Sequence, residues 1–155
     1  MKKKRVSTLA ALALIAGLGL SPALPPAHAV DNMSSTDAPD LTSVRTKIKA
    51  RDYVSALAEL RKLADDVQHA DVYNLLGFTL RKTGDFKTSL TYYTKAIEMA
   101  PEHKAAREYL GELYVETGNM EKAKEQLAVL AKLCPGGCEE REDLQKAINA
   151  KSASN

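Results

Sequence analysis

The sequence has no tryptophan and only two phenylalanines among its 155 residues. Alanine, leucine, lysine and glutamate are abundant instead, a composition that favours helices and leaves few residues for a β-rich core. The sequence also has no glycine-rich loop that would cradle a phosphate, and no serine or cysteine in a nucleophile motif. Its carboxylates alternate with lysines in the way typical of solvated helix faces. These absences predict a protein that is not an enzyme.

The first 29 residues have the order of a Sec-type signal peptide. Basic residues at positions 2–5 precede an apolar run from Val6 to Leu20, and prolines and the triplet Ala27-His28-Ala29 follow. We expect cleavage after Ala29 and a periplasmic mature protein. The apolar run is shorter than the roughly 18–20 residues that span a bilayer, so no stable membrane insertion is expected after cleavage.

Removal of this segment changes the net charge. The whole chain has 22 basic and 20 acidic side chains, and four of the basic ones but no acid precede residue 30, which leaves 18 against 20 and a net charge of −2. Binding to nucleic acid needs a basic surface, so the composition excludes that class of partner. The 126 residues from position 30 onward are enough for one compact domain with its own core.

Residues 70–103 and 104–137 are two copies of one 34-residue unit. The aligned segments are 73–77 with 107–111, 83–84 with 117–118, and 100–101 with 134–135. Within a unit, apolar residues recur at i, i+3, i+4 and i+7, and a glycine and then a proline mark the ends of two successive helices. Gly77 lies on the apolar face, where we expect the neighbouring helix to approach closely. The sequence therefore predicts repeated helix pairs.

The residues of these units resemble the tetratricopeptide repeat signature, whose period is also 34 residues. The matching residues are Leu76, Gly77, Leu80, Gly84, Tyr93, Ala96 and Pro101 in one copy, and Leu110, Gly111, Tyr114, Gly118, Ala123 and Pro135 in the next. Upstream, Arg51-Asp52-Tyr53 resembles Gly84-Asp85-Phe86 at an offset of 33, which makes residues 41–69 a degenerate first copy without the glycines and the terminal proline.

The resemblance implies an all-α fold, a right-handed α-solenoid of about three helix pairs followed by a C-terminal capping helix at residues 138–150. A flexible leader at 30–40 and a disordered tail at 151–155 are expected on either side. The open ends of such an array leave room for a homo-oligomer.

The same resemblance implies a concave groove, lined by the first helix of each pair, that binds a protein or peptide partner. The predicted groove residues are Asn74, Phe78, Arg81, Glu108 and Glu112. Phe78 is either extra packing or an exposed anchor for a partner. Glu108, Glu112 and Glu116 form an i, i+4, i+8 row that is either a solvated face or a patch for a basic segment. Because acids occupy positions of the family's carboxylate clamp, we do not expect capture of a chaperone tail.

Cys134 and Cys138 flank a Pro-Gly-Gly turn, and an oxidising compartment favours their pairing. We predict a structural disulfide that pins the capping helix and contributes about 2 kcal/mol through its short loop. The alternative is a role in envelope-protein assembly or thiol handling. Three residues separate the cysteines instead of the two of a thioredoxin-like pair, and Glu139 stands where haem attachment needs a histidine.

No cofactor and no metal site are predicted. His69 and His103 occupy one repeat position and are interpreted as turn residues, while His28 leaves with the signal peptide. What remains is a periplasmic scaffold or adaptor for a protein or peptide partner.

Overall fold

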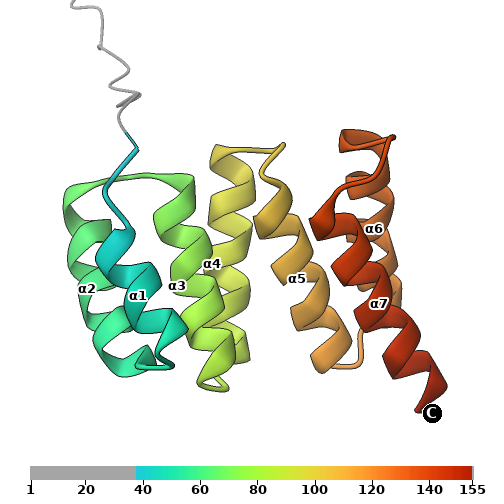
Figure 1. Ribbon diagram of the computed structural model, residues 1–155, viewed down its shortest axis with the longest axis horizontal. Coiled ribbons are helices and arrows are strands. Elements are labelled where there is room, and N and C mark those ends of the chain that lie inside the picture. The colour runs from blue at the N-terminus through green and yellow to red at the C-terminus, as the bar shows by residue number, and fades with distance from the viewer. Residues whose placement is uncertain (1–37, 155) are drawn as a thin grey trace, which may run out of the picture. The chain divides into compact units, whose positions relative to one another are not determined.

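The computed structural model describes residues 38–154. In this range the chain forms seven α-helices and no strand (Figure 1). The helices are α1 (Thr42–Lys49), α2 (Tyr53–Asp66), α3 (Ala70–Lys82), α4 (Phe86–Met99), α5 (Lys104–Glu116), α6 (Met120–Leu133) and α7 (Glu139–Ala153). The predicted signal peptide, the leader up to residue 37 and Asn155 lie outside the described residues.

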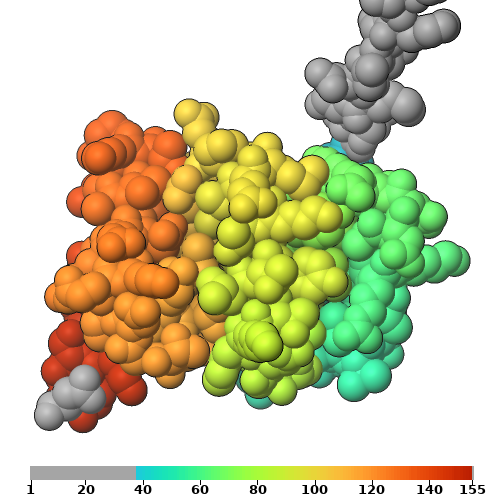
Figure 2. Space-filling view, turned by 180° about the vertical axis from the view of Figure 1, so that it is seen from behind, coloured from blue at the N-terminus to red at the C-terminus, as the bar shows by residue number. Residues whose placement is uncertain are grey.

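The helices pack as antiparallel pairs, α1 with α2, α3 with α4 and α5 with α6, and α7 covers the last pair. In Figure 1 the odd-numbered helices α1, α3, α5 and α7 lie in front of the even-numbered ones. Figure 2, seen from behind, shows α2, α4 and α6 as the opposite face. We call these two sets the odd layer and the even layer. The predicted all-α fold of stacked helix pairs with a final single helix is confirmed.

The turn inside each pair has the same backbone conformation. Gly84 and Gly118 have φ angles of +86° and +79°, in the left-handed region that glycine enters without steric cost. Arg51, the residue that the offset of 33 aligns with Gly84, also has a positive φ, of +60°. The first pair therefore makes the same turn with a residue that is strained there.

Side chains at matching repeat positions cap the helices. The N-cap residues of the even-numbered helices are Asp52, Asp85 and Asn119, whose side-chain oxygens accept from backbone N–H groups three residues later. In α3 and α5 the caps are His69 and His103, whose Nδ1 atoms accept from the backbone N–H groups of Asp71 and Ala106. The interpretation of both histidines as turn residues is confirmed.

Glycine on the odd helices allows close packing, as predicted. A Cβ atom on Gly77 would lie 2.6 Å from Cδ1 of Tyr93, a fully buried ring on α4. A Cβ on Gly111 would collide with the side chain of Leu144 on α7. Helix α7 thus packs on α5 through the same kind of contact, although no second helix of its own follows in the described residues.

The core runs through the whole array as three connected groups of buried side chains. The first pair contributes Leu41, Val44 and Leu60, which are all at most 6% exposed. Leu144 and Ile148 of α7 close the other end against α5 and α6. The degenerate first copy and the capping helix are therefore integral parts of the fold.

Helix α7 is longer than predicted. It continues to Ala153, so the expectation of a disordered tail from position 151 is wrong up to that residue. The hydroxyl of Ser152 donates to the carbonyl of Ile148 at 3.0 Å, and no glycine or proline interrupts this stretch. Alanine and lysine sustain a helix beyond its last buried contact because their intrinsic helix propensity is high.

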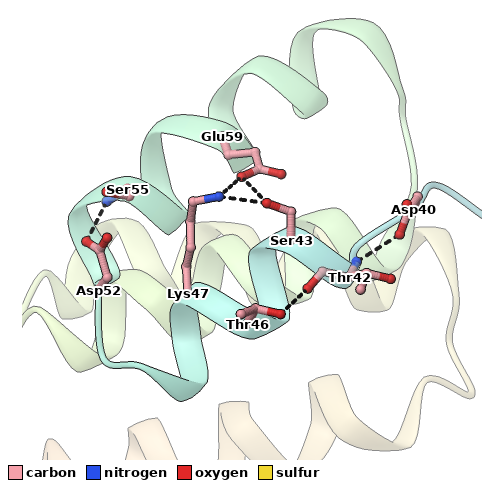
Figure 3. Close-up of polar contacts among 8 residues, drawn as sticks. All are labelled: Asp40, Thr42, Ser43, Thr46, Lys47, Asp52, Ser55 and Glu59. Carbon is pink, nitrogen blue, oxygen red and sulfur yellow. Dashed lines mark hydrogen bonds and ion pairs between the residues drawn. The ribbon is translucent and has the colours of Figure 1, made fainter.

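A polar cluster joins α1 to α2 (Figure 3). The Lys47 ammonium donates to Oε2 of Glu59 at 2.6 Å and to Oγ of Ser43 at 2.7 Å, and the Ser43 hydroxyl donates to the same Glu59 oxygen at 3.0 Å. The bond from Lys47 is the main reason that the pKa of Glu59 lies below its ordinary value. Lys47 is therefore engaged toward the even layer.

Candidate functional site

The odd layer carries a pocket of about 230 Å³. Three helices line it: α1 with Arg45, Ile48 and Lys49, α3 with Leu75 and Phe78, and α5 with Tyr109. The two cations, Arg45 and Lys49, both come from α1, and the remaining four lining residues are apolar or aromatic. The pocket thus joins the first three helices of the odd layer into one surface that is partly apolar and aromatic and partly positively charged.

Two aromatic rings lie next to each other in the lining of this pocket. The Phe78 and Tyr109 ring centroids are 5.1 Å apart with the planes tilted by 54°, a favourable aromatic arrangement. The Arg81 guanidinium carbon lies 5.6 Å from the Phe78 centroid and 5.8 Å from that of Tyr109. Phe78 is partly buried and lines the pocket at the same time. It therefore combines the packing role and the partial exposure that the sequence left as alternatives.

Arg81 is an internal ion-pair centre. Its side chain is 1% exposed, and its two terminal nitrogens donate separately to carboxylates of α5, Nη1 to Oε1 of Glu116 at 2.6 Å and Nη2 to Oε2 of Glu112. Charge-assisted bonds of this kind are stronger than neutral ones. Two members of the predicted acidic row therefore hold α5 to α3, and they are not free solvated side chains.

Glu108, the third member of the row, is 8% exposed and has no ion-pair partner within the described residues. Burial, with the nearby charges of Glu112, Asp143 and Glu140, raises the pKa of Glu108 from 4.5 to about 8 against the opposing charge of Arg81. Its carboxyl group is consequently mostly protonated at neutral pH.

Tyr109 lies between charges of opposite sign. Burial is the main cause that raises the pKa of its hydroxyl; Glu108 and Glu112 raise it further, while Arg81 and Arg45 lower it. The cations of the pocket lining therefore belong to α1, while the glutamates that act on the Tyr109 pKa are not part of that lining.

Asn74 is 4% exposed, and its Oδ1 atom has no hydrogen-bond partner in residues 38–154. Of the five predicted groove residues, Asn74, Arg81 and Glu108 are thus buried, and only Phe78 and Glu112 keep partial exposure. The structure brings Phe78, Arg81 and Glu112 together.

Sequence reasoning missed five of the six residues that line the pocket, Phe78 being the exception. The missed residues are Arg45, Ile48, Lys49, Leu75 and Tyr109. The spacing of Arg45, Ile48 and Lys49 at i, i+3 and i+4 was an available signal, because these positions share one helix face. The first copy is one residue out of register with the later copies, so these residues of α1 could not be aligned with the groove positions of α3 and α5.

The sulfur atoms of Cys134 and Cys138 lie 2.07 Å apart, at disulfide distance. Cys134 is the C-terminal cap residue of α6, and Cys138 is the N-terminal cap residue of α7. Gly137 makes the turn between them with a φ of +98°. The pair therefore links the last helix pair to the capping helix, away from the pocket of the odd layer.

A wider pocket of about 780 Å³ lies at the turns between repeats, around His69 and His103. Nε2 of His103 is 2.9 Å from Oδ1 of Asp71, and both histidines already serve as helix caps. No group of three or more His, Cys, Asp or Glu residues in the described part of the chain has an arrangement that would hold a metal ion. None of the described helices is both long and apolar enough to cross a bilayer.

Comparison with known proteins agrees with the repeat architecture. A family model described as "Tetratricopeptide repeat" matches residues 80–136. The chain is also similar to a protein of Guillardia theta named "Uncharacterized protein ycf37", with 33% identity over 66 residues that cover 43% of this chain and 37% of that protein. The repeat period, the stacked helix pairs and the family match together identify tetratricopeptide repeats in this chain at residues 80–136.

Proposed function

We propose that this protein is a periplasmic scaffold that binds a protein or peptide segment across its odd layer. Tetratricopeptide repeats generally mediate protein–protein interactions. The observation that carries the proposal is the pocket between α1, α3 and α5, where the rings of Phe78 and Tyr109 come together beside apolar side chains. Partly exposed aromatic residues in pockets supply much of the binding energy of protein interfaces.

The size of the pocket supports a protein partner. Its volume of about 230 Å³ lies below the roughly 300–1,000 Å³ of typical small-molecule sites. A side chain that projects from a partner fits such a volume, while the rest of the partner contacts the surface of the odd helices. Binding at this pocket is therefore expected to need an apolar side chain of the partner, and free small molecules are expected to bind poorly there.

The test compares Phe78→Ala with Val54→Ala on an array of short synthetic peptides of varied sequence. Val54 is 80% exposed on α2, in the even layer, so its truncation is the matched control. If Phe78 anchors the partner, Phe78→Ala lowers the affinity for the bound peptides about 30-fold, as expected for loss of about 2 kcal/mol of binding free energy at an interface hot spot. Equal binding by both variants, with helicity intact in circular dichroism, would contradict the proposal.

The periplasmic location rests on the order of basic, apolar and small residues before position 30. Expression in a Gram-negative host, followed by fractionation and N-terminal sequencing, tests it. Processed protein that begins at Val30 in the periplasmic fraction is the expected result. Unprocessed protein in the cytoplasm would refute this part of the proposal.

A second candidate function, thiol handling during envelope-protein assembly, is favoured by the position of Cys134 and Cys138 between two helix ends. Equilibration with glutathione buffers separates it from a structural role. A pair that resists reduction is a structural link, and a pair that is reduced easily and exchanges with other thiols supports the second function.

Pairing of two copies through the ends of the array stays a prediction. The end helices α1 and α7 each lack a neighbour on one side in the described chain. Sedimentation equilibrium over a range of protein concentrations measures whether a dimer forms, and a constant monomer mass would contradict it.

A further inference from the structure

We propose that the pocket of the odd layer selects a partner segment in which an aspartate or glutamate side chain lies close to a large apolar side chain. This inference rests on the proposed function, because it names the kind of segment that the same pocket would bind. It commits to a side-chain carboxylate within the segment.

The apolar part of the partner follows from the lining. Ile48, Leu75, Phe78 and Tyr109 surround the pocket from three helices. Burial of apolar surface against such side chains is favourable by roughly 25 cal/mol per Å². A polar side chain placed against Ile48, Leu75 and the Phe78 ring would lose contacts with water without finding hydrogen-bond partners among these side chains.

The carboxylate follows from two cations at the edge of the pocket. Arg45 and Lys49 both line it, both are exposed, and neither has an ion-pair partner within residues 38–154. They are four residues apart, so they lie on the same face of α1. Lys47, which lies between them in the sequence, is engaged on another face of α1, where it donates to Glu59 and Ser43 (Figure 3). Helix α1 therefore presents two unpaired positive charges to a ligand in the pocket.

Both cations of the lining belong to α1, so only the flank of the segment that faces α1 meets positive charge there. A second acidic residue on the other flank is therefore expected to add little to the affinity.

The segment is expected to pass through the site and not to end in it. The lining spans α1, α3 and α5, so a chain whose apolar residue fills the pocket continues over the odd layer on at least one side. The inference takes the carboxylate near α1 to be that of a side chain. Peptides with amidated C-termini retain this group and lose the terminal one.

The experiment measures fluorescence anisotropy of four labelled, amidated peptides with a central leucine. They carry one acidic residue beside the leucine, acidic residues on both sides, one basic residue, or no charged residue. The peptide with one acidic residue is expected to bind about three- to tenfold more tightly than the uncharged one, as for one or two partly exposed ion pairs. The preference should shrink in high salt.

The double variant Arg45→Gln/Lys49→Gln is expected to remove this preference. Lys47→Gln is the matched control, because it removes a cation of the same helix that is bound to Glu59. Three results overturn the inference while leaving the proposed function intact: equal binding of charged and uncharged peptides, a preference that survives in the double variant, or binding only when the C-terminus is a free acid. If none of the four peptides binds, or Phe78→Ala binds them unchanged, the proposed function itself fails.

Discussion

Replacement of Glu108 by glutamine is expected to remove a large pH dependence from the stability of the protein. The Glu108 carboxyl is 8% exposed, and its pKa is raised from 4.5 to about 8, first by burial and then by Glu112, Asp143 and Glu140. Between these two pH values the unfolded chain releases this proton while the folded chain retains it. The free energy of unfolding therefore falls as pH rises, and stability that is fully present below pH 4.5 is lost by about pH 8.

The size of the effect follows from the shift. Each pH unit between the two pKa values lowers the free energy of unfolding by about 1.4 kcal/mol. The rise of the Glu108 pKa from 4.5 to about 8 therefore corresponds to a loss of at most about 5 kcal/mol. Glutamine keeps the shape of the side chain and cannot ionise. At pH 5 the variant and the parent protein should be similar in stability, and at pH 9 the variant should be more stable by several kcal/mol.

Urea denaturation followed by far-ultraviolet circular dichroism at pH 5, 7 and 9 measures this difference. Other groups titrate over the same range, so the informative quantity is the unfolding free energy of the variant minus that of the parent protein. Glu121→Gln is the control, because the Glu121 side chain is 82% exposed. A difference for Glu108→Gln that does not change with pH would refute the reasoning about its burial.

Three further changes test the packing, the turns and the disulfide by the same denaturation assay. Gly77→Ala should lower the free energy of unfolding by about 1–3 kcal/mol, because the new Cβ would lie 2.6 Å from the buried ring of Tyr93. Gly136→Ala is the control and should have little effect, because nothing lies within 4 Å of its new Cβ. Arg51→Gly should raise stability by about 0.5–1 kcal/mol, because it relieves a φ of +60°; no gain would contradict that strain. The double change Cys134→Ser/Cys138→Ser should cost about 2 kcal/mol through the loss of a short closed loop, and an unchanged midpoint would refute the structural role.

The repeat could be predicted from sequence because its signals are local. The glycine of each turn, the following asparagine or aspartate cap and the 34-residue period all depend on residues close together in the chain. Even Arg51 could be placed by its alignment with Gly84, and it shares the positive φ of that glycine. The end of α7 was missed because no breaker marks it, and helix propensity alone extends the helix to Ala153.

The partners of the predicted groove residues could not be predicted in the same way. Arg81 contacts residues 31 and 35 positions later, and periodicity does not show which charged side chains of two neighbouring helices meet. The row of glutamates therefore looked like a surface feature, although Glu108 is buried and Glu112 is bound to Arg81.

The pocket itself depends on a third helix. Tyr109 completes it from α5, and Arg45 and Lys49 enter from the degenerate first copy, whose register differs by one residue. A site assembled from three repeats requires the stacking of all three to be known. Sequence alone identified Phe78, one of its two aromatic residues, because Phe78 stands beside the apolar stripe of α3.

Nuclear magnetic resonance of the labelled protein tests the central claim most directly. Titration with the amidated peptide that carries one acidic residue beside leucine should shift the backbone amide signals of α1, α3 and α5 around Ile48, Phe78 and Tyr109, with little change in α2, α4 and α6. Shifts concentrated in the even layer, or around Cys134 and Cys138, would show that the partner binds elsewhere and would contradict the account.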